Sequence, residues 1–143
     1  MPKSKGIPQI PIADMAAKDG KIYFSFKHLD NTNQKFNVTK CNADFFHALM
    51  EELRKYNHYT VEEFQDQNNE DNRHTIDFPH TTEEGGFPNI DEDQLGYCEA
   101  WQFGLSQYHL WRVHGILCND IFYIIWLDSE HLLCVMGGGK PKV

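Results

Sequence analysis

The feature that most constrains the fold is an apolar hairpin near the carboxyl end of the chain. Two runs rich in Ile, Val, Phe and Trp, at 111–118 and 121–127, are separated by Asn119-Asp120. These residue types favour β-strands, and Asn and Asp are typical turn residues. Because side chains this apolar have to be buried, the hairpin predicts two central strands of a sheet.

Three further strands are expected from the alternation of apolar and polar side chains. The segments 22–27, 35–40 and 101–105 all show this period of two, which is typical of a strand with one buried face. A cluster of turn residues at 30–33 separates the first two segments. We therefore expect those two strands to form an amino-terminal hairpin.

Two helices are expected between these strands. Asn42 can cap a helix whose apolar residues recur every three or four positions as far as Tyr56. The segment from Thr60 to Glu63 has the form of a capping box, which predicts a second, shorter helix. The order of strand, strand, helix, helix, loop and three strands predicts an α+β fold. In that fold, an antiparallel sheet has an amino-terminal hairpin, two helices packed on one face, and a carboxyl-terminal three-strand antiparallel unit.

The chain of 143 residues is expected to form a single domain, 1–143, because this length supports one hydrophobic core. Residues 1–20 are expected to form an extended lead-in, and 136–143 a flexible tail. Residues 66–99 are expected to form a long acidic loop. Loops of this length in compact domains are usually functional or partly disordered.

The four cysteines are scattered, and none forms the close pair typical of a zinc site. We expect reduced thiols, with Cys118 and Cys134 packed as small apolar residues. His74 and His80 lie near each other in sequence, but no third ligand in register completes a metal site. No apolar run approaches the roughly 20 residues that cross a bilayer, and the amino-terminal segment lacks the apolar core of a signal peptide. The expectation is a cytoplasmic protein with no membrane partner, metal or cofactor.

The net charge of −8 comes from one segment. Residues 61–100 contain twelve Asp and Glu but a single basic residue, Arg73. Such a segment repels RNA and attracts cationic surfaces. It favours a non-catalytic interaction protein whose acidic loop binds a basic partner or imitates nucleic acid. A solvated loop without a partner explains the charge equally well.

Ionisable side chains along the hairpin form a candidate catalytic site. Counting outward from a two-residue turn pairs residues whose numbers add up to 239. In this register Tyr108, Arg112, His114 and His131 share one side of the sheet. Four residues of strand span about 13 Å, so Arg112 and His131 would flank a substrate rather than touch.

This combination of side chains suits the cleavage of an RNA phosphodiester without a metal. A histidine can remove the 2′-hydroxyl proton or protonate the leaving oxygen, because it titrates near neutral pH. An arginine can stabilise the charged pentacoordinate phosphoryl group with its planar fork of donors. The hairpin therefore favours an endoribonuclease.

Each candidate also has a structural explanation. His114 could be a core histidine hydrogen-bonded to a neighbour, and Arg112 could pair with Asp128 or with the acidic loop. His131 could be an ordinary solvated residue at a strand end, and Tyr108 could belong to a turn. The sequence alone leaves these alternatives open.

The chain resembles the RelE/YoeB/ParE toxin superfamily over roughly 42–64 and 101–133. The resemblance is carried by helices before a terminal antiparallel sheet, by Trp111-Arg112-Val113-His114, and by a histidine just after an apolar final strand. Members that cut messenger RNA, usually on the ribosome, use an arginine on a middle strand and acid/base residues near the carboxyl end. The resemblance implies that Arg112 and His131 fill these roles in a toxin-like, metal-independent endoribonuclease of a mobile-element or defence locus. It also implies RNA or the ribosome, and an antitoxin, as partners.

Overall fold

The computed structural model describes residues 20–66, 72–88, 90, 98–105 and 108–134. The proposed lead-in, apart from Gly20, and the proposed tail lie outside the described residues. Within the described part of the chain, no helix is long and apolar enough to cross a membrane.

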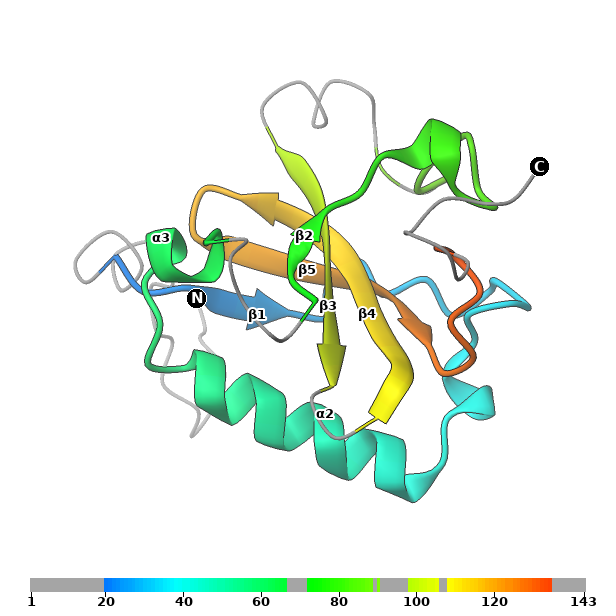
Figure 1. Cartoon of the computed structure of the whole chain (residues 1–143), viewed down its shortest axis with the longest axis horizontal. Coiled ribbons are helices and arrows are strands. Elements are labelled where there is room, and N and C mark those ends of the chain that lie inside the picture. Colours follow the sequence, from blue (N-terminus) through cyan, green and yellow to red (C-terminus); the bar gives the residue numbers. More distant parts are fainter. Residues whose placement is uncertain (1–19, 67–71, 89, 91–97, 106–107, 135–143) are drawn as a thin grey trace, which may run out of the picture.

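The fold is α+β, as the sequence predicted, with a five-stranded sheet and two α-helices. The strands are β1 (Tyr23–Ser25), β2 (His74–Thr75), β3 (Glu99–Leu105), β4 (Tyr108–Cys118) and β5 (Ile121–Asp128). The helices are α2 (Ala43–Tyr56) and α3 (Val61–Phe64), with short 3-10 turns η1 (Val38–Lys40) and η2 (Phe78–His80). The strand order is β1-β5-β4-β3-β2 (Figure 1). Strand β1 runs parallel to β5, so the sheet is mixed, and the prediction of a purely antiparallel sheet was wrong.

The predicted amino-terminal hairpin is absent from the described residues, because 35–40 does not form a strand. The Asn33 side chain accepts hydrogen bonds from the backbone of Lys35 and Phe36, and Asn37 caps η1 by accepting from Thr39 N. These side-chain bonds compete with strand pairing. Phe36 is nevertheless buried, stacked on Trp126 with ring centroids 4.7 Å apart. The apolar alternation therefore reflected burial of a loop, and β1 pairs with β5 instead.

Both predicted helices are present with the caps expected from sequence. The Asn42 side chain accepts from Phe45 N at the start of α2, and Thr60 and Glu63 form a reciprocal capping box at the start of α3. Helix α2 turns its apolar stripe towards the sheet, which Figure 1 shows above it. We call this side of the sheet the helix face. Its buried residues on the sheet are Trp101, Phe103, Leu105, Val113, Leu117, Phe122, Ile124 and Leu127.

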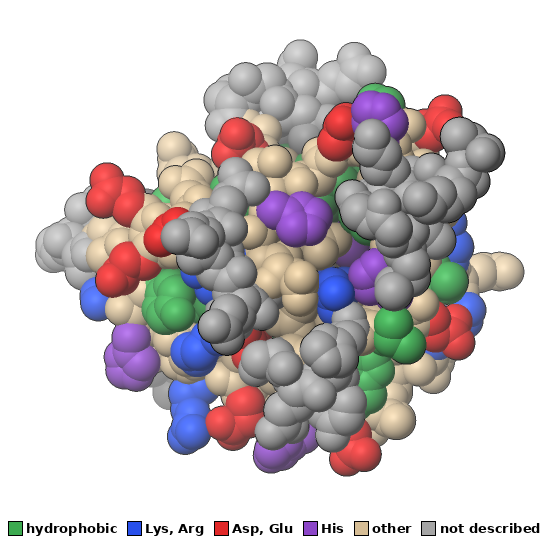
Figure 2. All heavy atoms as spheres, viewed as in Figure 1, with side chains coloured by type: hydrophobic (Ala, Val, Ile, Leu, Met, Phe, Trp, Pro, Cys, Tyr) green, Lys and Arg blue, Asp and Glu red, His purple; other side chains and the backbone are tan. Residues whose placement is uncertain are grey.

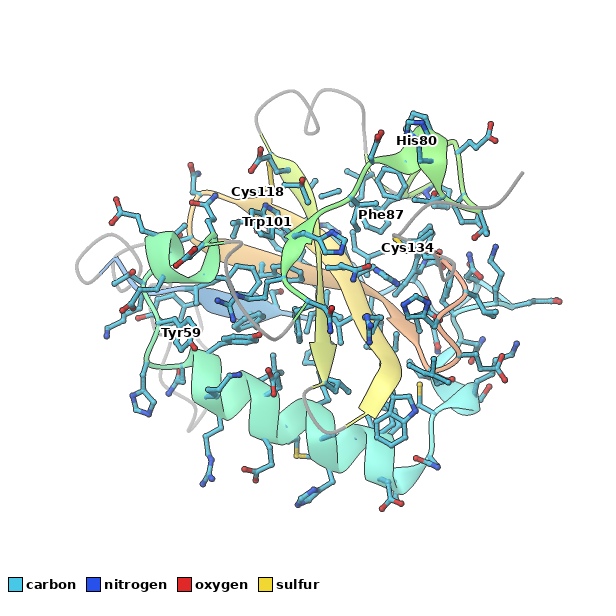
Figure 3. The ribbon with its side chains drawn as sticks, in the orientation of Figure 1. Tyr59, His80, Phe87, Trp101, Cys118 and Cys134 are labelled. Carbon is cyan, nitrogen blue, oxygen red and sulfur yellow. A yellow bond between two sulfur atoms is a disulfide. The ribbon has the colours of Figure 1, made fainter. Side chains whose placement is uncertain are left out.

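The opposite side, which we call the loop face, is covered by irregular segments instead of helices. Segments at 30–36, 76–88 and 129–134, together with Ile90, pack on it and form a second core cluster. Phe87 and Cys134, from two of these segments, both belong to this cluster (Figure 3). From the sheet the cluster takes Cys98, Ile116, Ile125 and Trp126.

A β-bulge in the central hairpin decides which side chains reach the loop face. Near the turn the pairing follows the predicted sum of 239, as in Cys118 with Ile121. The register shifts between His114 and Gly115, so that Arg112 pairs with Asp128 instead of the predicted Leu127. Bulges insert one extra residue into one strand, here Ile125. The predicted register was therefore correct near the turn and wrong beyond it.

The loop predicted at 66–99 contains ordered structure. Strand β2 lies in it and pairs with β3, and Ile76 N donates to Ala100 O just beyond β2. Arg73 is buried among the rings of Tyr56, Tyr59 and Phe64 and donates from Nε to Phe64 O at 3.0 Å. The single basic residue of this acidic segment therefore fixes its first part against the helices.

The prediction that all four cysteines are reduced thiols was wrong. Cys98 and Cys118 form a disulfide between β3 and β4, with a Cα–Cα distance of 4.5 Å. The two residues lie directly opposite each other in continuation of the Glu99–Leu117 pair. The two cysteines are 20 residues apart in the sequence, and this spacing does not indicate that they are neighbours. Cys41 and Cys134 are free, and Cys134 is buried as expected.

Candidate functional site

A buried histidine–aspartate pair forms the centre of the candidate site. His114 Nε2 and Asp128 Oδ2 are 3.0 Å apart, and both residues are fully buried on the loop face. Asp128 also accepts backbone N–H groups, so its partner nitrogen on His114 acts as the donor. Burial raises the pKa of Asp128, but the hydrogen bond and charge of His114 and the N–H groups of Leu132 and Leu133 outweigh it and hold that pKa below its usual value. The carboxylate is therefore ionised over the physiological range.

The same carboxylate organises the turn after β5. Leu132 N donates to Asp128 at 2.8 and 2.9 Å from its two oxygens, and Leu133 N donates to Oδ2 at 3.0 Å. Within this turn His131 has a φ of +58°, a left-handed conformation that few residues other than Gly adopt without cost. Leu133 and Cys134 pack into the second core cluster. Asp128 thus holds the turn that carries His131 against the loop face.

Arg112 lies in the same part of the sheet, directly opposite Asp128 in the β4–β5 register. Its side chain is largely buried, and one terminal nitrogen donates to Trp111 O at 3.1 Å. Burial and the nearby positive charge of Arg112 lower the pKa of His131, while Asp128 opposes them. His131 is accordingly neutral near pH 7, and it lies within electrostatic reach of the guanidinium.

Two free thiols border this cluster but are not activated. Burial raises the pKa of Cys134 to about 11, and the charge of Asp128 adds to the effect. Burial also raises the pKa of Cys41 to about 11, with Asp128 again contributing. Because the thiolate is the nucleophile, neither cysteine suits nucleophilic chemistry here.

The structure brings three of the four predicted residues together. Arg112 and His114 project to the loop face from alternate positions of β4, and the turn carrying His131 folds onto that face. The backbone of Tyr108 begins β4 and pairs with Leu105, but its side chain lies outside the described residues. The predicted pairing of Tyr108 with His131 does not occur, because β5 ends at Asp128, opposite Arg112.

Sequence reasoning missed two polar residues of the site. The sequence suggested Asp128 only as one possible partner of Arg112, because the predicted register placed Asp128 on the face of the sheet opposite to Arg112 and His114. Gln102 lies opposite His114 in the β3–β4 register and is 2% exposed. Gln102 Oε1, His114 Nδ1 and His131 Nδ1 are buried without a hydrogen-bond partner among the described residues. Unsatisfied buried polar atoms are rare in native structures and indicate places where a ligand or water binds.

A metal site is not supported by the residues that the structure describes. No group of three or more His, Cys, Asp and Glu in them could hold a metal ion. His74 Nδ1 bonds to Thr75 O at 2.8 Å, and His80 Nδ1 bonds to Asp77 at 2.7 Å. The two histidines therefore have separate partners.

Comparisons with known proteins do not connect the chain to a family. No protein-family model, curated protein or solved structure matches it significantly. The resemblance to RelE/YoeB/ParE toxins stays a prediction, and the function has to be argued from the geometry.

Proposed function

We propose that this protein is a metal-independent endoribonuclease of toxin type. The observation that supports the proposal is the meeting of Arg112 and His131 on the loop face, where the guanidinium charge helps to keep the imidazole neutral. A neutral histidine can accept the 2′-hydroxyl proton of RNA. The guanidinium beside it can bind the phosphoryl oxygens as their charge increases.

His114 has a positioning role in this proposal. Its ring is fully buried and bonded to Asp128, so it does not reach a polymeric substrate. Through Asp128 it is connected to the turn that carries His131. Removing His114 would therefore act on catalysis through the placement of that turn.

The alternative, an interaction protein that uses its acidic segment, has less support among the described residues. Several acids of this segment are already engaged within the chain. Glu83 forms an ion pair of 2.6 Å with Lys35, Asp77 bonds to His80, and Glu63 completes the capping box of α3. These contacts reduce the charge that remains for a basic partner.

The proposal places the enzyme in the cytoplasm with RNA or the ribosome as its target and an antitoxin as its natural inhibitor. Disulfides are seldom maintained in that compartment. The β3–β4 pairing extends over seven residue pairs besides the Cys98–Cys118 bond. We therefore expect the fold and the activity to survive reduction.

The test is cleavage of a mixed-sequence RNA by the purified protein in excess EDTA, with mapping of the ends. Cleavage should leave 2′,3′-cyclic phosphate and 5′-hydroxyl ends. His131→Asn should reduce the rate about 100-fold or more, because Asn tolerates a positive φ but cannot transfer a proton. Arg112→Lys should reduce it as well, since lysine keeps the charge but not the fork.

His80→Asn is the matched control, because His80 is an exposed histidine bonded only to its own segment. Absence of cleavage by the parent protein, or equal rates for the parent, His131→Asn and Arg112→Lys, would exclude the proposed activity.

A further inference from the structure

We propose that His74 is a second catalytic residue, which protonates the leaving oxygen of the RNA substrate on the side of Arg112 opposite His131. This inference rests on the proposed ribonuclease function and assigns a role that His131 cannot fill in the same step. Phosphodiester cleavage needs one group that takes a proton and another that gives one.

The sheet register places His74 on the same face as the site. His74 pairs with Gln102, and Gln102 pairs with His114, so the three residues form one row across β2, β3 and β4. Directly paired residues project to the same side of a sheet. Ile76, two residues after His74, packs into the loop-face cluster, which confirms the side. His74 therefore shares the loop face with Arg112.

The next row along the strands contains Gly104, Arg112 and Asp128. Because Gly104 has no side chain, β3 places no group between Arg112 and β2 in this row. Strands lie about 4.8 Å apart and two residues span about 7 Å, so the Cα atoms of His74 and Arg112 are about 12 Å apart. A phosphate together with its neighbouring ribose is long enough to bridge two side chains on one face at this separation.

His131 and His74 belong to segments on opposite sides of β4, the strand that carries Arg112. His131 follows β5 on one side of β4, whereas His74 belongs to β2 on the other side. Figure 2 shows histidine side chains on either side of a Lys or Arg side chain near the middle of the face in view. Base and acid on opposite sides of the phosphoryl group are what an in-line displacement requires.

The tautomer of the His74 ring suits proton transfer through Nε2. Its Nδ1–H donates to Thr75 O, since a carbonyl can only accept, and this bond fixes the tautomer. Nε2 is then the nitrogen that can carry and release a second proton. The ring is half-buried, so a substrate can reach it.

Gln102 supplies an independent sign of a ligand in this row. It is almost fully buried, and its Oε1 has no partner among the described residues. Unsatisfied buried polar atoms of this kind are rare and mark positions with a functional or bound partner. The row that contains His74 is therefore polar below the surface, although the buried amide itself, like His114, does not reach a polymeric substrate.

In the reaction, the neutral His131 imidazole takes the 2′-hydroxyl proton, and the 2′-oxygen forms a bond to phosphorus. The bond from phosphorus to the 5′-oxygen breaks, and the protonated His74 gives its Nε2 proton to that oxygen. The products are a 2′,3′-cyclic phosphate and a 5′-hydroxyl. Solvent then returns each histidine to its starting protonation state.

The experiment compares two substrates that differ in their need for an acid. One set is ribodinucleotides, and the other is ribonucleoside 3′-(4-nitrophenyl phosphates), whose leaving group departs as a stable phenolate. His74→Ala should lower kcat for the dinucleotides about 10²- to 10⁴-fold. The same variant should cleave the aryl esters within a few-fold of the parent. His131→Asn should lose activity on both sets, and His80→Asn on neither.

If His74→Ala loses the same factor in kcat on both substrate sets, His74 has a structural role and the assignment is overturned. The assignment is also overturned if His74→Ala cleaves the dinucleotides at the parental rate. Both results leave the ribonuclease function in place. If the parent cleaves neither set, the proposed function itself fails, and the assignment of His74 with it.

Discussion

Replacing Asp128 by Asn should be the most damaging conservative change at the site. The carboxylate accepts from His114 Nε2 and from the backbone of Leu132 and Leu133. The amide keeps one acceptor oxygen, but its NH₂ group faces N–H donors at the other position. Hydrogen bonds to charged groups contribute about 1.5–3 kcal/mol each. An amide oxygen in place of Oδ2 could keep these bonds, but bonds to a neutral acceptor are about half as strong. Weakening three of them and placing the NH₂ group against Leu132 N gives a destabilisation of about 4 kcal/mol.

The assay is urea unfolding followed by the fluorescence of the buried tryptophans. With a denaturant slope of about 2 kcal/mol per molar, the midpoint should fall by about 2 M. Because the pKa of Asp128 is lowered in the folded state, its contribution is complete above the ordinary value of 3.8 and is lost as the pH falls through the folded value. The difference between the parent and Asp128→Asn should therefore shrink on acidification below that pH.

Asp120→Asn is the matched control, because Asp120 lies in the turn of the same hairpin and its side chain has no partner among the described residues. It should shift the free energy of unfolding by less than about 0.5 kcal/mol. A loss of less than about 1 kcal/mol for Asp128→Asn, or a loss equal to the control, would refute the view that this carboxylate holds the turn and His114 together.

Three further outcomes follow from the fold. Gly115→Ala should cost about 3 kcal/mol in thermal or urea unfolding, since a Cβ there would collide with the backbone of β5, whereas Gly85→Ala, with open space around it, should not. Replacing Cys98 and Cys118 by Ser should lower stability by about 3 kcal/mol for a closed loop of this length, while circular dichroism shows the fold intact. The pKa of His131 is lowered on folding, so its neutral form contributes stability that is complete above pH 6.5 and is lost as the pH falls through the folded pKa. His131→Asn should therefore flatten the pH dependence of the free energy of unfolding in that window.

Local patterns were sufficient to predict the helices and the central hairpin. Asn42 and the Thr60–Glu63 capping box start helices through bonds within a few residues, so the sequence contains their complete cause. The prediction of a strand at 35–40 was wrong because a buried Phe36 in a loop gives the same apolar alternation as a strand. Its actual conformation depends on side-chain bonds from Asn33 and Asn37.

The site was predictable only in part, since its geometry depends on long-range register. The parity of Arg112 and His114 along β4 was correct, because alternation is a property of one strand. The involvement of Asp128 depends on a bulge, and the proposed involvement of His74 depends on a two-residue strand inside an acidic segment. Neither feature has a local sequence signal. The Cys98–Cys118 disulfide also has no local sequence signal, because it depends on the pairing of β3 with β4.

The extra residue at Ile125 reverses the alternation of side chains between the two faces of the sheet for the second half of β5. If Ile125 paired regularly instead of bulging, every later residue of β5 would move by one position, and Asp128 would pair with Trp111 instead of Arg112. Trp111 packs on Phe45 of α2, so the carboxylate would then enter the apolar helix face. Pairing all the residues of the strand regularly would change no side chain, yet it would reverse which layer of the molecule receives the charge, whereas deleting Ile125 would remove the bulge and leave Asp128 opposite Arg112. The composition of the hairpin supplies the reactive groups, and the bulge in one strand determines which face of the sheet carries them.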